Sequence, residues 1–443
     1  MSINRRNFLK TTTAVAAGAS LALPNISVGA DKSGKKLRVA IIGVGGRGRH
    51  GIGMSKGEEI TALCDVDAGR LAGAGKQFPG AKKYQDYREM YKNLDDFDAV
   101  VVSTPDHQHY PMVIRAIRAK KAVYCEKPLT WSMWEALQLA EEAEKFKVPT
   151  QMGNQGMGSG GWRQAYNYIK SGAIGDVKEV HTYTGTHGGW FTDGIRTPAG
   201  KDPIPKGLDW DKWIGPAPMR PYKKGIYHPA KWRGWLDFGN GALGDWCCHL
   251  LNAFYKIYEP GMPISVECIS QTGPAIDTCP KGKAIKWEFA ADGKRPAFDA
   301  YWYDGVTKPP AIPGLDKGRK MGSAGSYIVG TKGICWVMGS HNQSATLVPE
   351  VARKAFGKVK SLAPNSRGHE REFISAAKGD IAYNAPLSHF GYGGLLTATA
   401  LMGNIAAQVK GKLLYDAKKQ IFTNSEAATK LMTRKPRSGW YVD

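Results

Sequence analysis

Short apolar runs alternate with amphipathic stretches in the first third of the chain. Runs of β-branched and other apolar residues predict strands that are buried on both faces of a parallel sheet. They lie at 37–42, 59–64, 98–103, 122–125 and 148–152. Stretches with helical spacing follow at 110–119 and 131–147. Strands that alternate with helices through right-handed crossovers predict an α/β domain with a doubly wound parallel sheet in residues 31–153.

The pattern changes after residue 153, and residues 154–443 are predicted to form a second domain. Three stretches have helical spacing, at 162–171, 367–377 and 394–408. Short runs separated by turn residues predict the strands of a large mixed sheet. They lie at 177–186, 264–271, 284–290, 297–303, 327–330 and 335–338. We expect an α+β domain whose last segment packs back on the first domain.

The first thirty residues have the pattern of an export signal. Arg5 and Arg6 precede a moderately apolar run at 13–23, and Ala30 suits cleavage after residues 1–30. The paired arginines are typical of twin-arginine export, and the run is too short to span a bilayer. Because this route moves folded proteins, we expect a periplasmic or otherwise exported protein that engages the twin-arginine machinery with its cofactor already bound. A transit peptide or a disordered basic tail is the alternative.

Composition and charge narrow the class of protein. Of the 443 residues, 42% are hydrophobic and 23% are charged, which is typical of a globular chain with two domains. The net charge of +22 is spread along the chain without a recognition motif, so nucleic-acid binding is not expected. Seven cysteines form no C-x-x-C pair, so we expect no metal site and no disulfide framework. A Cys268–Cys279 bridge remains open.

A glycine-rich turn follows the first predicted strand. Gly43, Gly45 and Gly48 satisfy G-x-G-x-x-G, with Gly46 and Arg47 between them. Such glycines permit a tight turn, close approach of the backbone to a pyrophosphate, and packing of the next helix, as in Rossmann dinucleotide-binding domains.

The second predicted strand ends at an acidic residue. Asp65 follows the glycines by about twenty residues, where a carboxylate accepts the ribose hydroxyls and repels a 2′-phosphate. The cofactor is therefore expected to be NAD rather than NADP, although Asp67 and Arg47 weaken that preference. The alternative is a plain turn, with Asp65 capping the next helix.

Two more strand ends carry polar residues at the edge of the sheet where ligands bind. Thr104, Pro105 and His109 follow one strand, and Glu126 and Lys127 follow the next. All five are candidate cofactor contacts. His109 is a candidate for contact with the nicotinamide ribose or the substrate, with a solvated loop histidine as the alternative.

Four motifs in order, GVGGRG, CDVD, STPDHQH and CEKPL, resemble the glucose–fructose oxidoreductase / inositol dehydrogenase / MocA family. The resemblance implies a Rossmann domain followed by an α+β domain built on a large open, mostly antiparallel sheet. It also implies that Lys127 lies in the active site beside the nicotinamide. Members of the family often associate through this sheet, so a homodimer or homotetramer is expected.

Asp245 and His249 are spaced i to i+4 after a glycine-rich stretch, so both side chains project from one helical face. The spacing resembles the second signature of the family, whose aspartate and histidine join the lysine in the active site. We expect His249 to be the acid/base, Lys127 to orient and polarise the hydroxyl, and Asp245 to bind substrate, the last two roles being exchangeable. A helix-start aspartate and a satisfied core histidine are the alternative.

Aromatic residues concentrate in the loop at 188–238. Trp190, Tyr227, His228 and Trp232 are candidate substrate contacts, since indole faces suit the CH faces of sugars. The alternative is that these rings fix the loop to the core.

Three functions fit these residues. The first is an oxidoreductase that moves hydride between a tightly bound nicotinamide cofactor and a sugar, polyol or glycoside hydroxyl. The second is a glycoside hydrolase that oxidises its substrate transiently through NAD, and the third is a glycan-binding protein stabilised by a cofactor. The lysine of the E-K-P motif, Lys127, favours the first.

Overall fold

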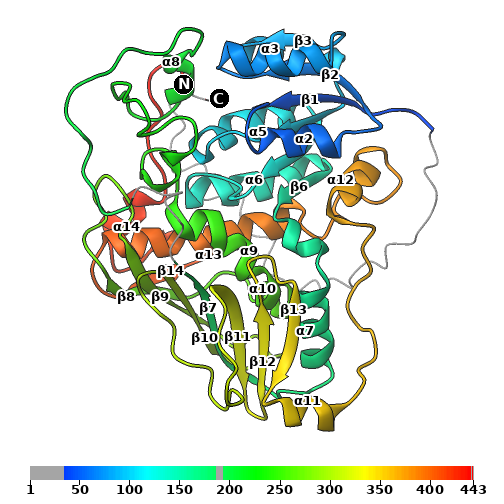
Figure 1. Cartoon of the computed structure of the whole chain (residues 1–443), viewed down its shortest axis with the longest axis vertical. Coiled ribbons are helices and arrows are strands. Elements are labelled where there is room, and N and C mark those ends of the chain that lie inside the picture. Colours follow the sequence, from blue (N-terminus) through cyan, green and yellow to red (C-terminus); the bar gives the residue numbers. More distant parts are fainter. Residues whose placement is uncertain (1–33, 186–192, 441, 443) are drawn as a thin grey trace.

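The computed structural model describes residues 34–185, 193–440 and 442, and Figure 1 shows its two sheets at opposite ends of the molecule. The first sheet has the strand order β3-β2-β1-β4-β5-β6, and all its pairings are parallel. Its strands are β1 (Arg38–Ile42), β2 (Glu59–Cys64), β3 (Lys82–Tyr84), β4 (Ala99–Val102), β5 (Ala122–Glu126) and β6 (Thr150–Gly153). This order confirms the Rossmann prediction, in which only β3 was missed.

Helices cover this sheet as the crossovers require. They are α2 (Gly48–Met54), α3 (Ala68–Gln77), α4 (Tyr87–Met90), α5 (His109–Arg118) and α6 (Met133–Phe146). The start of α6 is fixed by a capping box, in which the Ser132 hydroxyl accepts from the Glu135 N–H and the Glu135 carboxylate accepts from the Ser132 N–H. The helix ends at Lys147, whose φ of 51° is left-handed.

The second sheet has nine strands in the described part of the chain, in the order β13-β12-β11-β7-β10-β9-β8-β14-β15. Only β10 and β7 pair in parallel, which confirms a mostly antiparallel sheet. The strands are β7 (Val177–Thr184), β8 (Ser265–Gln271), β9 (Gly282–Phe289), β10 (Phe298–Gly305), β11 (Ala324–Gly330), β12 (Ile334–Met338), β13 (Ser344–Val348), β14 (Leu413–Asp416) and β15 (Ile421–Phe422). The last three were not predicted, and β14 and β15 are only four and two residues long.

Helix α13 (Phe390–Gln408) lies with α6 between the two sheets (Figure 1). Nearly all of its residues are buried. A Cβ on Gly394 would lie 2.7 Å from the Ala136 carbonyl oxygen, so glycine allows α13 to approach α6 closely. The other helices are α7 (Gly160–Lys170), α8 (Trp210–Ile214), α9 (Cys248–Leu250), α10 (Asn252–Tyr258), α11 (Glu350–Phe356), α12 (His369–Ala377) and α14 (Glu426–Leu431). The layer formed by α6 and α13 is shared by the two domains, and residues of both domains pack in one hydrophobic core around it.

The aromatic loop folds into a small core of its own. Its buried rings are Trp210, Trp213, Tyr222, Tyr227, Trp232, Trp235 and Phe238. The loop docks on the first domain, since the Gly207 carbonyl accepts from the Ala68 N–H at 2.9 Å and the Asp209 N–H donates to the Val66 carbonyl at 3.0 Å. These rings fix the loop in place, as the alternative interpretation held.

Two further expectations concern the chain as a whole. The seven cysteines all lie in described segments and are all free, so the Cys268–Cys279 bridge is not formed. Among the described helices, none combines the length and the apolar character that a membrane crossing requires.

Candidate active site

A cavity of about 1010 Å³ lies between the two domains. On one side it is lined by the carboxyl ends of β1, β2, β4 and β5, the edge where ligands bind in doubly wound sheets. On the other side it is lined by the aromatic loop, the turn before α9 and the segment between β12 and β13. Residues separated by hundreds of positions in the sequence therefore face one space.

The glycine turn forms part of the wall of this cavity. A Cβ on Gly43 would lie 2.6 Å from the Ser103 carbonyl oxygen, and one on Gly48 would lie 1.8 Å from that of Gly43. Gly43 also has a φ of +81°, which favours glycine. Gly45 and Gly46 line the cavity, and the Arg70 side chain covers Gly45, where a Cβ would lie 2.6 Å from Arg70 Cδ. The turn thus presents the open backbone of Gly46, with the Arg70 side chain packed over Gly45.

Asp65 lines the cavity at the end of β2 and is 9% exposed. Its carboxylate accepts the Val44 N–H at 3.0 Å and the Asp67 N–H at 2.9 Å. Burial raises the pKa of this carboxyl, and the two hydrogen bonds oppose the rise. The helix cap is Asp67 instead, which accepts from the Gly69 and Arg70 N–H groups at the start of α3. The alternative role of Asp65 as a helix cap is therefore wrong.

Arg47 and Glu126 line the cavity as an ion pair, with 2.8 Å between Nε and Oε1. Burial alone would raise the pKa of Glu126, but His50, whose Nδ1 lies 3.6 Å from Oε1, and the charges of Arg47 and Lys127 hold it below its ordinary value. The carboxylates of Glu126 and Glu370, the second hydrogen-bonded to His50 Nε2 at 3.0 Å, raise the pKa of His50 to about 9. The Glu126 carboxylate is therefore ionised, and its Oε2 has no hydrogen-bond partner among the described residues.

Of the three cofactor contacts predicted in the loop after β4, two line the cavity and one does not. Thr104 and Pro105 line the cavity. His109 is 1% exposed, and its ring nitrogens lie 2.9 Å from the carbonyl oxygens of Pro128 and Thr104. The prediction that His109 touches cofactor or substrate is therefore corrected, because its ring is buried between two backbone carbonyl oxygens and does not line the cavity.

Lys127 and Asp245 meet across the domain boundary. The Lys127 ammonium donates to Asp245 Oδ1 at 2.6 Å and to the Asp245 carbonyl at 2.7 Å. Arg233 Nε lies 3.3 Å from the same Oδ1. Burial would raise the pKa of Asp245, but Lys127 and Arg233 hold it below its ordinary value. The pair is a part-buried centre in which two basic side chains contact one carboxylate.

His249 lies in the same cavity, one turn beyond Asp245. Asp245 belongs to a π-helical turn (Leu243–Cys247) that leads directly into α9. His249 is 3% exposed and its Nδ1 has no hydrogen-bond partner among the described residues. Burial and the nearby charges of Lys127 and His341 lower the pKa of His249 well below its ordinary value. The ring is neutral at pH 7, and the lowered pKa makes it a weaker base than a free imidazole.

Several cavity residues were missed by the sequence reasoning, among them Arg70 beside the glycine turn and three ionisable residues near Lys127 and His249. Arg233 is described above, and His341 lies with its ring centroid 4.4 Å from that of His249. Asp106 is 4% exposed and accepts from Asn240 Nδ2 at 3.2 Å. Burial and the charge of Asp245 raise the pKa of Asp106 to about 7. Asp106 stands in the PDHQH stretch and carried a positional signal, whereas Arg233 and His341 occupy loops with none.

The four predicted substrate residues have different surroundings. His228 and Trp232 line the cavity, and burial together with the charge of Arg70 lowers the pKa of His228 to about 4. Tyr227 has no exposed surface and packs between Trp235 and Phe238, so its assignment as a substrate contact is corrected. Trp190 lies outside the described residues.

Comparison with known proteins identifies both domains and the leader. The GFO/IDH/MocA oxidoreductase family profile for an NAD-binding Rossmann fold matches residues 37–154. The profile for the C-terminal alpha/beta domain of this oxidoreductase family matches residues 164–299. A twin-arginine translocation signal profile matches residues 2–22, which indicates export by that route.

Individual relatives match over part of their length. An inositol 2-dehydrogenase from Salmonella typhimurium is 32% identical over 151 residues, covering 33% of this chain and 45% of that enzyme. A glycosyl hydrolase family 109 protein from Shewanella pealeana is 33% identical over 175 residues, covering 33% of this chain and 38% of that protein. The chain therefore aligns with less than half the length of each relative.

A solved structure supports the fold over a longer span. The WlbA dehydrogenase from Bordetella pertussis, solved with NADH and UDP-GlcNAcA, superposes with a TM-score of 0.58 at 16% identity. The superposition covers 86% of this chain and 99% of that one. With both domain profiles matching in order, the chain belongs to the GFO/IDH/MocA oxidoreductase family.

Proposed function

We propose that this chain is an exported NAD-dependent oxidoreductase that moves hydride to or from a secondary hydroxyl of a sugar, polyol or glycoside. The observation that carries the proposal is the joint placement of Lys127, Asp245 and His249 in one cavity with the glycine turn. We place its work in the periplasm, beyond the export step indicated by the leader.

The residues of the cavity fit a nicotinamide dinucleotide. Gly45 and Gly46 offer backbone that a phosphate can approach, and Arg70 adds a cation beside them. Asp65 lies at the strand end where a ribose hydroxyl can donate to it. Two buried polar atoms, Glu126 Oε2 and His249 Nδ1, lack partners among the described residues, and such atoms in a cavity need a ligand or water. When bound, NAD supplies the carbon that accepts or returns the hydride.

The protein groups handle the proton of the substrate hydroxyl. His249 is neutral, and its unpaired Nδ1 can take the proton as hydride leaves the carbon. Lys127 has three N–H donors, of which two are used by Asp245. The third can donate to the substrate oxygen and stabilise the negative charge that develops there. Asp245 fixes the Lys127 ammonium, and His341 lies close enough to His249 to restrict its ring.

Location bears on how the cofactor is used. An exported enzyme has no nicotinamide pool around it, so NAD must be carried through export and restored in place by a second substrate. We therefore propose a tightly bound cofactor, loaded before export, and a homodimer or homotetramer as the assembled form.

The relatives also support a second candidate, a glycoside hydrolase that oxidises, eliminates, hydrates and re-reduces its substrate. The glycosyl hydrolase family 109 relative is the observation in its favour. Net chemistry would then be hydrolysis with the cofactor restored in each cycle.

One experiment separates these candidates. The mature protein is purified without added cofactor, denatured, and its released dinucleotide identified by mass spectrometry. The intact protein is then incubated with free sugars and glycosides while the reduced-nicotinamide absorbance band is recorded. Lasting reduction that a carbonyl sugar reverses supports the oxidoreductase, and release of the aglycone without net reduction supports the hydrolase. A protein that neither contains nor binds NAD would exclude both.

A further inference from the structure

The segment 434–440 leaves the second domain and crosses back to the first, beside the cavity. Trp440 lines the cavity and is 4% exposed. The ring centroids of Trp440 and Tyr87 lie 6.4 Å apart. The central carbon of the Arg88 guanidinium lies 4.2 Å from the centroid of the indole ring. Arg88 Nη1 also donates to the Gly439 carbonyl at 3.4 Å. An indole from the far end of the second domain therefore forms part of the cavity wall on the first.

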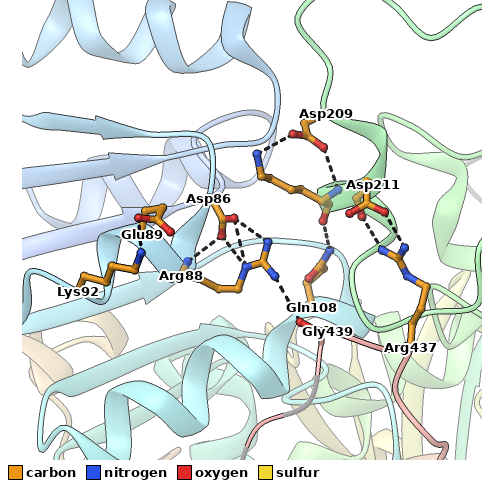
Figure 2. A network of polar contacts seen from close by, with 10 residues as sticks. Asp86, Arg88, Glu89, Lys92, Gln108, Asp209, Asp211, Arg437 and Gly439 are labelled. Atoms are coloured by element: carbon orange, nitrogen blue, oxygen red, sulfur yellow. Dashed lines mark hydrogen bonds and ion pairs between the residues drawn. The ribbon is translucent and has the colours of Figure 1, made fainter.

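Arg437 fastens the same segment to α8. Its Nη1 donates to Asp211 Oδ1 at 2.6 Å, its Nη2 to the Asp211 carbonyl at 3.0 Å, and its Nε to the Gly215 carbonyl at 3.1 Å. The Arg437 N–H donates to the Pro216 carbonyl at 3.1 Å. Figure 2 shows that Arg437 contacts Asp211 on α8, whereas the Gly439 carbonyl contacts Arg88 of the first domain. Guanidinium bonds of this kind fix both position and orientation.

Helix α8 is itself held on the first domain. Gln108 Nε2, labelled in Figure 2, donates to the Lys212 carbonyl and to the Trp213 carbonyl, both at 2.8 Å. Lys212 and Trp213 both line the cavity. The segment 434–440 and α8 thus form one connected structure, here named the clasp, that spans the cavity edge.

The end of the cavity beside the clasp is the one nearest β2. Asp65, Gln85, Asp86 and Tyr87 line it together with Trp440. In a Rossmann domain the acidic residue at the end of the second strand faces the ribose of the adenosine half. The clasp therefore lies against the half of the dinucleotide that takes no part in hydride transfer.

We propose that the clasp retains the adenosine half of NAD, so that the cofactor dissociates only when Arg437 and Trp440 separate from the first domain and α8. This inference rests on the proposed function and adds the residues responsible for tight binding. The clasp contacts neither Lys127 nor His249 in the described structure, so the proposal expects substrate to exchange at those residues while the clasp stays closed. Cofactor retention and substrate turnover are thereby assigned to different parts of one cavity.

The test measures how fast NAD leaves. Wild type, Trp440→Ala, Arg437→Gln and Lys430→Ala are loaded with isotopically labelled NAD and transferred into excess unlabelled NAD, and the retained label is followed after rapid gel filtration. Lys430 is the matched control, because it forms only an exposed pair with Glu426 on α14. Trp440→Ala and Arg437→Gln are expected to release NAD at least about tenfold faster, equivalent to about 1.4 kcal/mol, and Lys430→Ala at the wild-type rate.

Thermal melts without NAD separate retention from folding. Arg437→Gln removes far less buried apolar surface than Trp440→Ala, so it stays informative if Trp440→Ala unfolds. Variants that melt lower than wild type but release NAD at its rate would overturn the clasp. Wild type that holds NAD, with both variants holding it equally well, would overturn the clasp and leave the proposed function standing. Wild type that never binds labelled NAD would overturn both.

Discussion

The molecule contains two buried Lys–Asp pairs of nearly equal length and different surroundings. Lys127 and Asp245 lie 2.6 Å apart with side chains 15% and 13% exposed, in a cavity. Lys283 and Asp304 lie 2.8 Å apart with side chains 1% and 2% exposed, inside the second sheet where β9 pairs with β10. Distance alone does not distinguish the pair proposed for catalysis from the structural one.

The difference lies in how the remaining hydrogen-bonding capacity is used. Asp304 also accepts from the Lys283 N–H and the Trp302 indole N–H, both at 2.9 Å, so protein groups satisfy it. Its charge raises the pKa of Lys283 despite burial. The cavity pair instead stands beside His249 Nδ1, which is left without a protein partner among the described residues. The two pairs therefore differ in access to the cavity, because Lys127 and Asp245 line it and Lys283 and Asp304 do not.

The largest effect is expected for Lys127→Met. Losing the donor to the substrate oxygen should lower kcat by about 10²- to 10⁴-fold. Asp245 keeps Arg233 as a partner, so the melting temperature should change little. Steady-state kinetics with whichever sugar or glycoside reduces the bound cofactor in the absorbance experiment, together with a thermal melt, check both parts. Full activity in this variant would refute the assignment of Lys127.

Lys283→Met should leave the chemistry intact and damage the fold. Removing one partner leaves Asp304 as an uncompensated buried charge, which costs about 3–5 kcal/mol. Urea unfolding followed by tryptophan fluorescence measures the loss, and the activity of the folded fraction is the control. A stable but inactive protein would reverse the distinction drawn between the two pairs.

The carboxyl of Asp106 lies in the same cavity as that of Asp245 but accepts a hydrogen bond from Asn240 rather than from a lysine. Burial raises its pKa from 3.8 to about 7, so its contribution to the free energy of unfolding falls as pH rises between these values. Asp106→Asn should therefore stabilise the protein at pH 8 by on the order of 1 kcal/mol and have a smaller effect at pH 5. Melting temperatures at the two pH values check this. An equal shift at both would contradict the raised pKa.

The smallest effect is expected for Lys430→Ala. Its pair with Glu426 is 2.8 Å long, but the two side chains are 73% and 83% exposed. Water and salt screen such a pair, so no measurable change in melting temperature is expected. A clear loss would mean that exposure is a poor guide to the value of ion pairs in this chain.

Much of the first domain could be predicted, because its signals are local. A buried strand followed by Gly43 and Gly48 specifies a turn that other residues cannot form, and the carboxyl end of each strand locates its loop. The same reasoning misplaced His109, since sequence position shows that a side chain is near a strand end and not whether backbone carbonyls already occupy its nitrogens.

The second half of the site depends on long-range packing. Asp245 and His249 could be found from spacing and resemblance, whereas Arg233 and His341 reach the cavity only through the folding of two loops. Tyr227 and Trp232 belong to one aromatic loop, yet only Trp232 lines the cavity. The sequence of an irregular loop has no hydrophobic periodicity, so it does not indicate which aromatic ring will face the cavity.

The bond from Arg88 to Gly439 joins residues 351 positions apart. Contacts of such high sequence separation form late, because the intervening chain must be ordered before they gain any stability. The parallel sheet relies on shorter connections and can assemble first. On this folding order the first-domain wall of the cavity forms early, and segment 434–440 docks on it last. Docking of this segment would then indicate that the rest of the chain has already reached its native topology.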